Sequence, residues 1–395
     1  MNLFLPELWD QQEPIELIQR QQQINPVVWC EDSIKGPHWS VLSDEHVRLV
    51  ELDHETFSAE GITISTDQDS MIPAMVAMDP PEHTVRRKAI NGFFSSDSMR
   101  ELSSLIRKNT IEVLESLPVN TEFDWVSVVA NELPYRVLCY LLDYPYEEKE
   151  QMIKWERSVM PPTELIQGRC KKSPKVISDE EWHSLNEERF TLQTECLFYF
   201  DAIRQERLKN PKDDFITKLA EVSEDAGEFY GNILLLLTGS MDSLRASMTG
   251  AVYMLDKNNI QLTPDTIENA VHETIRLQSP IRYMAREATR DTELSGNKIK
   301  KGDLLYLWFT AANRDASVYA NPNSFDLQRE NSSKHLAFGH GVHKCIGYRL
   351  GQLELKILLE ELSKRYKVKV LSEPRRVHSF VEGAYENLQV SLETL

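Results

Sequence analysis

The stretch at residues 338–347, Phe-Gly-His-Gly-Val-His-Lys-Cys-Ile-Gly, contains a cysteine suited to hold a metal. Cys345 stands between glycines, which let another group approach the backbone closely. A long amphipathic helical pattern follows at once, and the positive end of a helix dipole stabilises a thiolate. The sequence therefore predicts a metal bound through sulfur at this point of the chain.

Zinc is one candidate for that metal, because His335, His340 and His343 lie close to Cys345 in the sequence. No second cysteine lies near enough to complete a closed tetrahedral site. The glycines also suit a flat group that approaches the sulfur. The spacing therefore argues against zinc.

Asp242 is an acid in the middle of residues 231–255, the most apolar long helical run. A buried acid is costly without a purpose, so Asp242 is either a functional group or a carboxylate satisfied by a cationic side chain. Gly239 and Ser240 are poor helix formers, and they predict a local opening in the hydrogen-bond ladder of this helix.

Two charged pairs lie at helical spacing. His83 and Arg87, at i and i+4, share one face and could hold one anion together, or could form a solvated face. Glu273 and Arg276, at i and i+3, also share a face, and most such pairs are surface pairs of small energetic value.

These residues are expected in a mainly α protein with a small β portion. Glycine is sparse, at 15 of 395 residues, and helical periodicity dominates the second half of the chain. β-branched runs at 36–60 and alternation at 367–395 predict short strands. Length alone would suggest two or three domains.

The charge of the chain excludes several classes of partner. With 62 acidic and 44 basic residues, a net charge of −18 repels nucleic acids and anionic membrane surfaces. The N-terminus lacks both a basic leader and the ~20 apolar residues of a membrane span, so no membrane anchor is expected. Five scattered cysteines imply no disulfide framework. We expect a soluble, cytoplasmic protein.

The motif Phe338-Gly339-x-Gly341-x-His343-x-Cys345-x-Gly347 resembles the haem-binding signature of the cytochrome P450 family. Glu273-x-x-Arg276 resembles the structural pair of that family, and segments 313–315 and 325–326 resemble the chain that precedes its haem loop. The match runs from about Trp39 to Tyr385. The resemblance implies the cytochrome P450 fold, with residues 1–395 as a single haem domain.

The resemblance also implies haem b (iron protoporphyrin IX) as the cofactor, with Cys345 as the axial thiolate on the iron. Glu273 and Arg276 would be buried and structural. The residues that match haem-binding positions are His83, Arg87, Arg286, Phe338, His343, Cys345 and Gly347, of which His83, Arg87, Arg286 and His343 match propionate-binding positions.

Residues 239–243 resemble the oxygen-activation motif of the family, although Ser240 and Ser243 replace its usual glycine and threonine. In this register Asp242 relays protons and Ser243 orients water. A second register places Gly239 on the motif glycine and Asp242 on the alcohol. The first also aligns Arg245 and residues 247–250 with related sequences.

Within the family, residues 36–41, 57–60, 77–81 and 123–126 are most similar to the soluble bacterial alkane and fatty-acid terminal hydroxylases. This similarity implies a monooxygenase that inserts one oxygen atom of O2 into an apolar aliphatic or fatty-acyl substrate. Ferredoxin and ferredoxin reductase, as separate proteins, would supply electrons. An acidic ferredoxin would dock near Lys344 and Arg349.

Two alternatives remain. One is a hydroxylase or oxidase of a terpenoid, steroid or other natural-product scaffold, and the other is a haem-thiolate sensor of a gas or ligand without turnover. Residues 59–78 form either a surface loop or a wall of an apolar cavity. The expected pocket walls are Met71, Ile72, Met75, Leu235, Gly239, Ile281, Tyr283, Val381 and Ala384.

Overall fold

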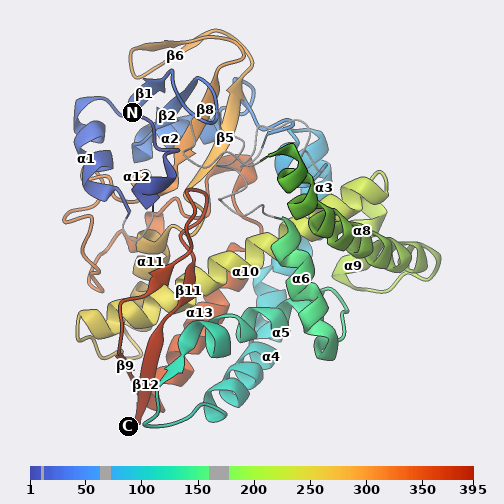
Figure 1. The fold of residues 1–395 in the computed structure, drawn as a ribbon, viewed down its shortest axis with the longest axis vertical. Coiled ribbons are helices and arrows are strands. Elements are labelled where there is room, and N and C mark those ends of the chain that lie inside the picture. Colours follow the sequence, from blue (N-terminus) through green and yellow to red (C-terminus); the bar gives the residue numbers. More distant parts are fainter. Residues whose placement is uncertain (10–12, 63–72, 160–177) are drawn as a thin grey trace.

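The computed structural model describes residues 1–9, 13–62, 73–159 and 178–395. Helices dominate, with the largest sheet gathered at one end (Figure 1). This arrangement confirms the predicted mainly α fold with a small β portion. The helices of eight or more residues are α1 (Ile15–Ile24), α2 (Asp44–Leu52), α3 (Glu82–Ile90), α4 (Ser96–Glu115), α5 (Glu132–Leu141), α6 (Lys149–Val159), α8 (Asp179–Lys209), α9 (Phe215–Val222), α10 (Ala226–Lys257), α11 (Ile267–Gln278) and α13 (Tyr348–Ser363).

The largest sheet has five strands in the order β1-β2-β8-β5-β3. Strands β2 and β8 pair in parallel, and the other neighbours pair antiparallel. Its strands are β1 (Val27–Cys30), β2 (His38–Val41), β3 (Phe57–Ser58), β5 (Tyr283–Ala288) and β8 (Leu304–Trp308).

Short strands from several parts of the chain form the smaller sheets. The three-stranded sheet has the order β4-β12-β9, and two hairpin-like pairs join β6 with β7 and β10 with β11. Their bounds are β4 (Phe123–Asp124), β6 (Thr292–Leu294), β7 (Asn297–Ile299), β9 (Tyr366–Val370), β10 (Arg375–Arg376), β11 (Tyr385–Asn387) and β12 (Gln389–Thr394).

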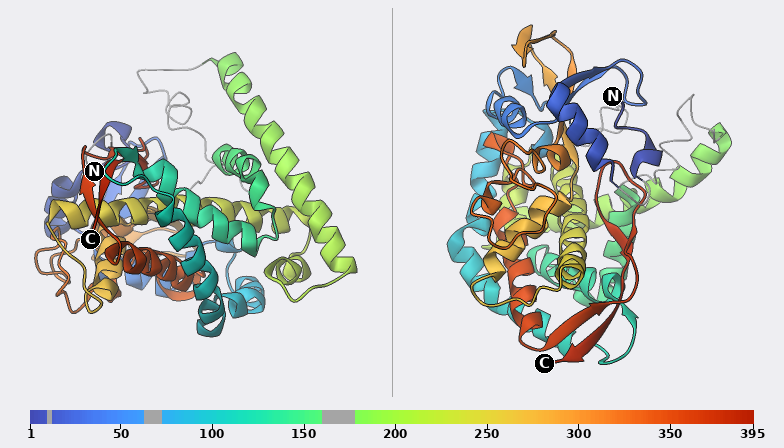
Figure 2. Two further views of the ribbon diagram at one scale, coloured as in Figure 1. Left: turned by 90° about the horizontal axis from the view of Figure 1, so that it is seen from below. Right: turned by 90° about the vertical axis from the view of Figure 1, so that its left-hand side faces the viewer.

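Helix α10 crosses the middle of the molecule, and α8 lies at one side of the molecule, where it contacts α10 (Figure 2). The carboxylate of Asp225 caps α10 by accepting the Glu228 N–H at 2.8 Å. Because α10 touches α5, α6, α8, α11 and α13, it is buried around most of its circumference. The apolar sequence of 231–255 predicted this burial.

Two hydrophobic cores meet along α10. Its first half, including Leu237 and Met241, packs in one core with residues of α4, α6 and α8. Its second half, from Leu244 and Met248 onward, packs in another core with α11, α13 and β12. Asp242 therefore lies at the junction of the two cores.

A third core surrounds the N-terminal residues. The ring of Phe4 contacts Tyr283 at 5.1 Å and Tyr306 at 4.7 Å between centroids, and Trp9 stacks on Trp308 at 5.6 Å. Tyr283 is fully buried in this cluster. The prediction of Tyr283 as a pocket wall is therefore wrong, because its ring packs against the N-terminal segment.

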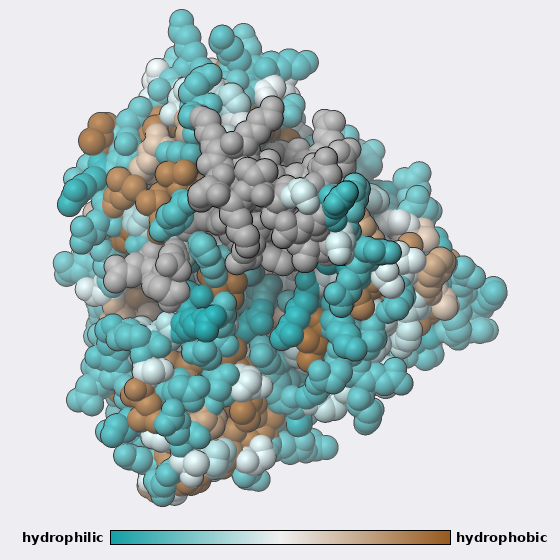
Figure 3. All heavy atoms as spheres, viewed as in Figure 1, coloured by the Kyte–Doolittle hydropathy of each residue, from teal (hydrophilic) through white to brown (hydrophobic). Residues whose placement is uncertain are grey.

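The coloured surface in Figure 3 is mostly hydrophilic, and hydrophobic residues form small groups within it. No helix within the described part of the chain is long and apolar enough to span a bilayer.

Candidate active site around Cys345

The loop that carries Cys345 is held by its own backbone. The Cys345 N–H donates to the Phe338 carbonyl at 2.8 Å, and Gly339 N–H donates to the Leu336 carbonyl at 2.9 Å. Helix α13 begins at Tyr348 with Gly347 as its N-cap. The predicted position of Cys345 just before a helix is confirmed.

Two glycines of this loop are required by a neighbouring helix. Gly339 and Gly341 have φ values of +66° and +64°, which favour glycine. A Cβ on Gly341 would lie 2.3 Å from the Glu51 carbonyl oxygen, and one on Gly339 would lie 3.1 Å from Glu51 Oε1. Glu51 of α2 is therefore the group that requires glycine at these two positions. The approach of a flat group to the sulfur stays a prediction.

Cys345 is accessible although protein surrounds it. Its side chain is exposed, and yet burial raises the pKa of its thiol. The Gly347 N–H, Arg87 and Lys344 partly oppose this rise. The thiol is therefore accessible and has cationic groups nearby that favour its thiolate.

Basic side chains from two elements, α3 and β5, approach the cysteine loop. From α3, the His83 ring lies 4.4 Å from the His343 ring, and Arg87 donates to the Lys344 carbonyl. From β5 comes Arg286, which is 2% exposed. The structure thus gathers four residues that are widely separated in sequence.

The histidines of this group are neutral and incompletely bonded. Burial, His343 and Arg87 lower the pKa of His83 to about 4. His83 Nδ1 and both ring nitrogens of His343 are buried without a hydrogen-bond partner among the described residues. Such unpaired polar atoms indicate a site for a polar ligand group.

Asp79 is a member of this group that sequence analysis missed. Its Oδ1 lies 3.9 Å from His343 Nε2, which is within ion-pair distance but too long for a hydrogen bond. Burial favours protonation of Asp79, but its contacts with His343, Ser58 and the Ala59 N–H lower its pKa to about 2. In the sequence, the two prolines that follow Asp79 are the only local feature that sets this residue apart.

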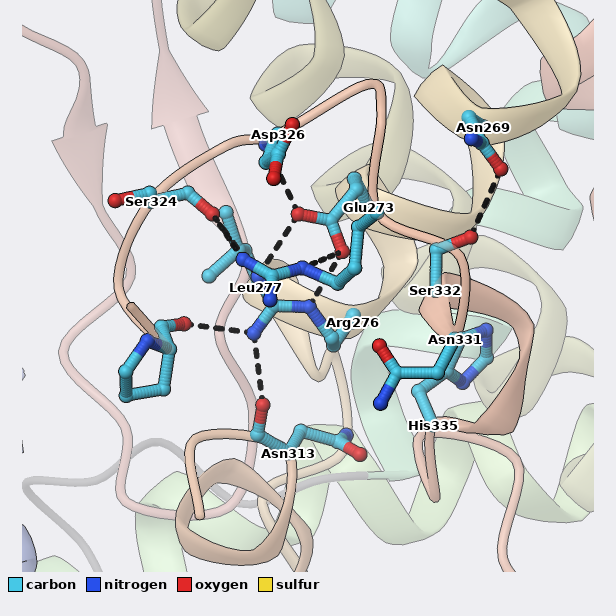
Figure 4. Close-up of polar contacts among 12 residues, drawn as sticks. Asn269, Glu273, Arg276, Leu277, Asn313, Ser324, Asp326, Asn331, Ser332 and His335 are labelled. Carbon is cyan, nitrogen blue, oxygen red and sulfur yellow. Dashed lines mark hydrogen bonds and ion pairs between the residues drawn. The ribbon is translucent and has the colours of Figure 1, made fainter. Parts of the chain in front are cut away.

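The Glu273–Arg276 pair is fully buried, so the surface alternative is wrong. Arg276 Nε lies 2.6 Å from Glu273 Oε1, and the guanidinium also donates to the carbonyls of Asn313 and Ser324 at 2.9 and 3.0 Å (Figure 4). Arg329 Nε, 3.0 Å from Glu273 Oε1, is a third member that the sequence did not indicate. This network ties α11 to the coil before the cysteine loop.

Helix α10 is continuous through Asp242, so the predicted opening of its hydrogen-bond ladder is wrong. The hydroxyls of Ser240 and Ser247 donate to the carbonyls of Leu236 and Ser243 at 2.5 and 2.8 Å, which satisfies them within the helix. Asp242 forms an ion pair with Arg245, so the second interpretation, an acid satisfied by a cation, is the observed one. The i, i+3 spacing could have indicated this pair.

One stripe of α10 is open although the helix is otherwise mostly buried. Leu235 is 39% exposed, Gly239 is exposed with no atom of the described residues within 4 Å of a Cβ position, and Ser243 is half-buried. These residues are four apart and share one face.

The other predicted pocket walls are more enclosed. Met75 and Ala384 are buried, Ile281 is half-buried, and Val381 is buried against the N-terminal core. Met71 and Ile72 lie outside the described residues.

Comparison with known proteins identifies the family. The Cytochrome P450 family profile matches residues 254–384. The structure of CYP153D17 from Sphingomonas sp. PAMC 26605 is 35% identical and superposes with a TM-score of 0.87 over 98% of each chain. This chain belongs to the cytochrome P450 family. It is a cytochrome P450 monooxygenase, and the family implies a haem cofactor.

Two further relatives of this P450 cover nearly all of it. Cytochrome P450-153 from Novosphingobium aromaticivorans is 32% identical, with a TM-score of 0.87 and 99% of each chain covered. Linalool 8-monooxygenase of Pseudomonas putida is 27% identical over 98% of this chain and 97% of that protein.

The residues present fit a haem. Arg87, Arg286, His83 and His343 supply cationic or unpaired polar groups for two propionates, while the accessible thiol of Cys345 supplies the ligand that P450 iron takes. Gly347, where a Cβ would lie 4.0 Å from Cys345 Sγ, leaves the space beside the sulfur free.

Proposed function

We propose that residues 1–395 form one haem b domain that hydroxylates a medium- or long-chain aliphatic or acyl substrate. The observation that carries this proposal is the open stripe of Leu235, Gly239 and Ser243 on α10. An apolar side chain, a bare backbone and a hydroxyl follow one another along one face. An apolar chain could lie along Leu235 and Gly239 and reach Ser243 at its reacting end.

In this proposal the haem, when bound, supplies the activation of O2. Cys345 would supply the thiolate ligand of its iron, and Phe338 and Gly347 would shape the loop on either side of the sulfur. Arg87, Arg286, His83 and His343 would hold its propionates.

Two side chains of α10 would serve proton delivery. Asp242 would relay protons, and the Ser243 hydroxyl would orient the water that passes them on. The ion pair with Arg245 keeps the Asp242 carboxylate in one orientation. Close packing of the cores on both sides of Asp242 limits other routes for water.

The apolar lining supports an aliphatic substrate. Met75 N–H donates to Asn232 Oδ1 at 2.9 Å, which places the loop of Met75 beside the turn of α10 that carries Leu235. Ile281 and Ala384 would complete the wall, whereas Val381 lies in the same buried core as Tyr283. A terpenoid scaffold is the chief rival, because one relative is named as a linalool monooxygenase.

A binding screen tests the substrate class. Purified holoprotein is titrated with fatty acids, alkanes, terpenoid alcohols and polar aromatics while the haem spin-state change is recorded. We expect the largest change with the aliphatic series and weaker binding in Leu235→Asp. A response to polar aromatics alone would contradict the aliphatic assignment.

We further propose an acidic ferredoxin, re-reduced by a ferredoxin reductase, as the electron donor. A hollow of about 440 Å³ opens beside the cysteine loop, with Arg48, Lys334, Phe338, His340, Lys344 and Tyr348 in its lining. Lys344 Nζ and the Arg349 guanidinium both lie on the Tyr348 ring, at 4.2 and 4.6 Å. On a chain with a net charge of −18, this local positive charge supports docking of an acidic partner.

Salt dependence tests this partner. Electron transfer from an acidic ferredoxin should weaken as ionic strength rises, because exposed charges are screened. Lys344→Glu should weaken it at low salt, whereas Lys298→Glu on β7 should not. A salt-independent rate would exclude electrostatic docking.

A further inference from the structure

Glu51, near the end of α2, is a buried acid between two parts of the haem site. It is 3% exposed, and its carbonyl and carboxylate are the groups closest to Gly341 and Gly339. The His340 N–H also stabilises its carboxylate. One residue of α2 thus contacts three consecutive residues of the cysteine loop.

The same carboxylate reaches Arg286 on β5. Glu51 Oε1 lies 3.7 Å from the Arg286 guanidinium, and both side chains are almost completely buried. Glu51 Oε2 is buried without a hydrogen-bond partner among the described residues. An unpaired carboxylate oxygen in such a place carries a desolvation cost that packing alone does not explain.

The charges around Glu51 come from two elements. Arg286 approaches from β5 and Arg48 from α2 itself, and both favour the ionised form. Burial opposes ionisation more strongly, so the pKa of Glu51 rises to about 7. Arg286 is shared, because Asp79 also interacts with it.

We propose that Glu51 is a positioning residue that holds Arg286 and the cysteine loop for the haem, and that its negative charge lowers the reduction potential of the haem iron. The step concerned is the one-electron reduction of ferric to ferrous iron by an external donor. A negative charge favours the more positive ferric form. This inference rests on the proposed haem-binding roles of Arg286 and Cys345.

The test compares substrate-free holoproteins by spectroelectrochemical titration with dithionite and mediators. Glu51→Gln keeps the shape and removes the charge, Glu51→Asp keeps the charge, and Glu45→Gln removes an exposed charge from the same helix. At a pH well above 7, Glu51→Gln should raise the midpoint potential, whereas Glu51→Asp and Glu45→Gln should stay near the wild-type value. Haem release to an excess of apomyoglobin should be faster in Glu51→Gln.

The outcomes separate this inference from the proposed function. A raised potential in Glu51→Gln alone supports it. An unchanged potential in a Glu51→Gln variant that retains haem would overturn it, even with faster haem release, since that pattern indicates packing without an electrostatic role. If the wild-type protein bound no haem, the proposed function itself would fail.

Discussion

Asp242 and Arg245 form an ion pair across one turn of α10, at the junction of two hydrophobic cores. The same guanidinium lies 4.0 Å from Glu156 Oε1 on α6. Burial raises the pKa of Glu156, although Arg245 opposes the rise. One cation therefore faces two buried acids, and Asp242 is the partner in direct contact.

The first prediction concerns proton delivery by α10. Asp242→Asn and Ser243→Ala should each leave haem binding intact and raise the fraction of electrons that end in peroxide, because the route for protons is interrupted. Coupling is measured as product formed per reduced nicotinamide consumed by the donor system. Ser240→Ala is the matched control, since the Ser240 hydroxyl is engaged with Leu236. Unchanged coupling in both test variants would contradict the proton route.

Substituting the cysteine tests the metal ligand. Cys345→Ser replaces a thiolate donor with an oxygen donor of almost the same size. The reduced, carbonyl-bound protein should therefore lose the absorption band typical of thiolate ligation. Cys139→Ser, a buried cysteine of α5, is the control that should retain the band. Persistence of the band in Cys345→Ser would rule out Cys345 as the ligand.

The buried network of α11 should not tolerate lysine. Arg276 contacts Glu273 with two nitrogens and also donates to the carbonyls of Asn313, Pro322 and Ser324. A lysine has three donors on one atom and cannot match this fork. Lysine keeps the charge but leaves some of these buried acceptors without a donor, which costs about 1–3 kcal/mol for each, so Arg276→Lys should lose at least that much unfolding free energy.

Urea denaturation of the holoprotein measures this loss. Arg100→Lys is the control, because Arg100 and its partner Asp97 are 79% and 80% exposed and such pairs contribute at most about 1 kcal/mol. Equal stabilities of the two variants would contradict a structural role for Arg276.

The sequence predicted the elements better than the contacts between them. Periodicity placed α10 and α13, and motif spacing indicated Cys345, His83 and Arg87, because these signals are local. The partners of Gly341 and Arg276 come from α2 and from distant coil, and no local pattern encodes such pairings. Tyr283 was misplaced for the same reason, since the N-terminal core that receives its ring is assembled from residues almost 280 positions away.

Gly341 provides a test of one such distant contact. An alanine there would need a φ of +64° and would place its Cβ 2.3 Å from the Glu51 carbonyl oxygen. Holding an alanine in this left-handed backbone conformation costs about 1–2 kcal/mol by itself. Gly296 has a φ of +74° and no atom of the described residues within 4 Å of a Cβ position, so Gly296→Ala measures this backbone cost without a steric clash. Gly341→Ala should lose clearly more unfolding free energy than Gly296→Ala. Equal losses would show that α2 moves away from the added methyl group without a loss of stability.

The last prediction concerns acid stability through Glu361 on α13. Burial favours its protonated form, but bonds from Lys364, Arg365 and Arg107 lower its pKa to about 2, from 4.5 in an unfolded chain. A lowered pKa means that the unfolded state binds the proton more readily than the folded state. The contribution of Glu361 is therefore present above pH 4.5 and disappears as the pH falls through 2.

Urea denaturation of the wild type and Glu361→Gln across this range measures the contribution. The difference in unfolding free energy should be constant above pH 4.5 and shrink continuously toward pH 2, because glutamine does not titrate. Glu360→Gln is the control, since among the described residues the Glu360 carboxylate bonds to Arg107 alone, and it is more exposed than that of Glu361. If the difference in unfolding free energy did not change with pH, the pKa of Glu361 would be the same in the folded and unfolded protein. The three cations would then not stabilise its carboxylate.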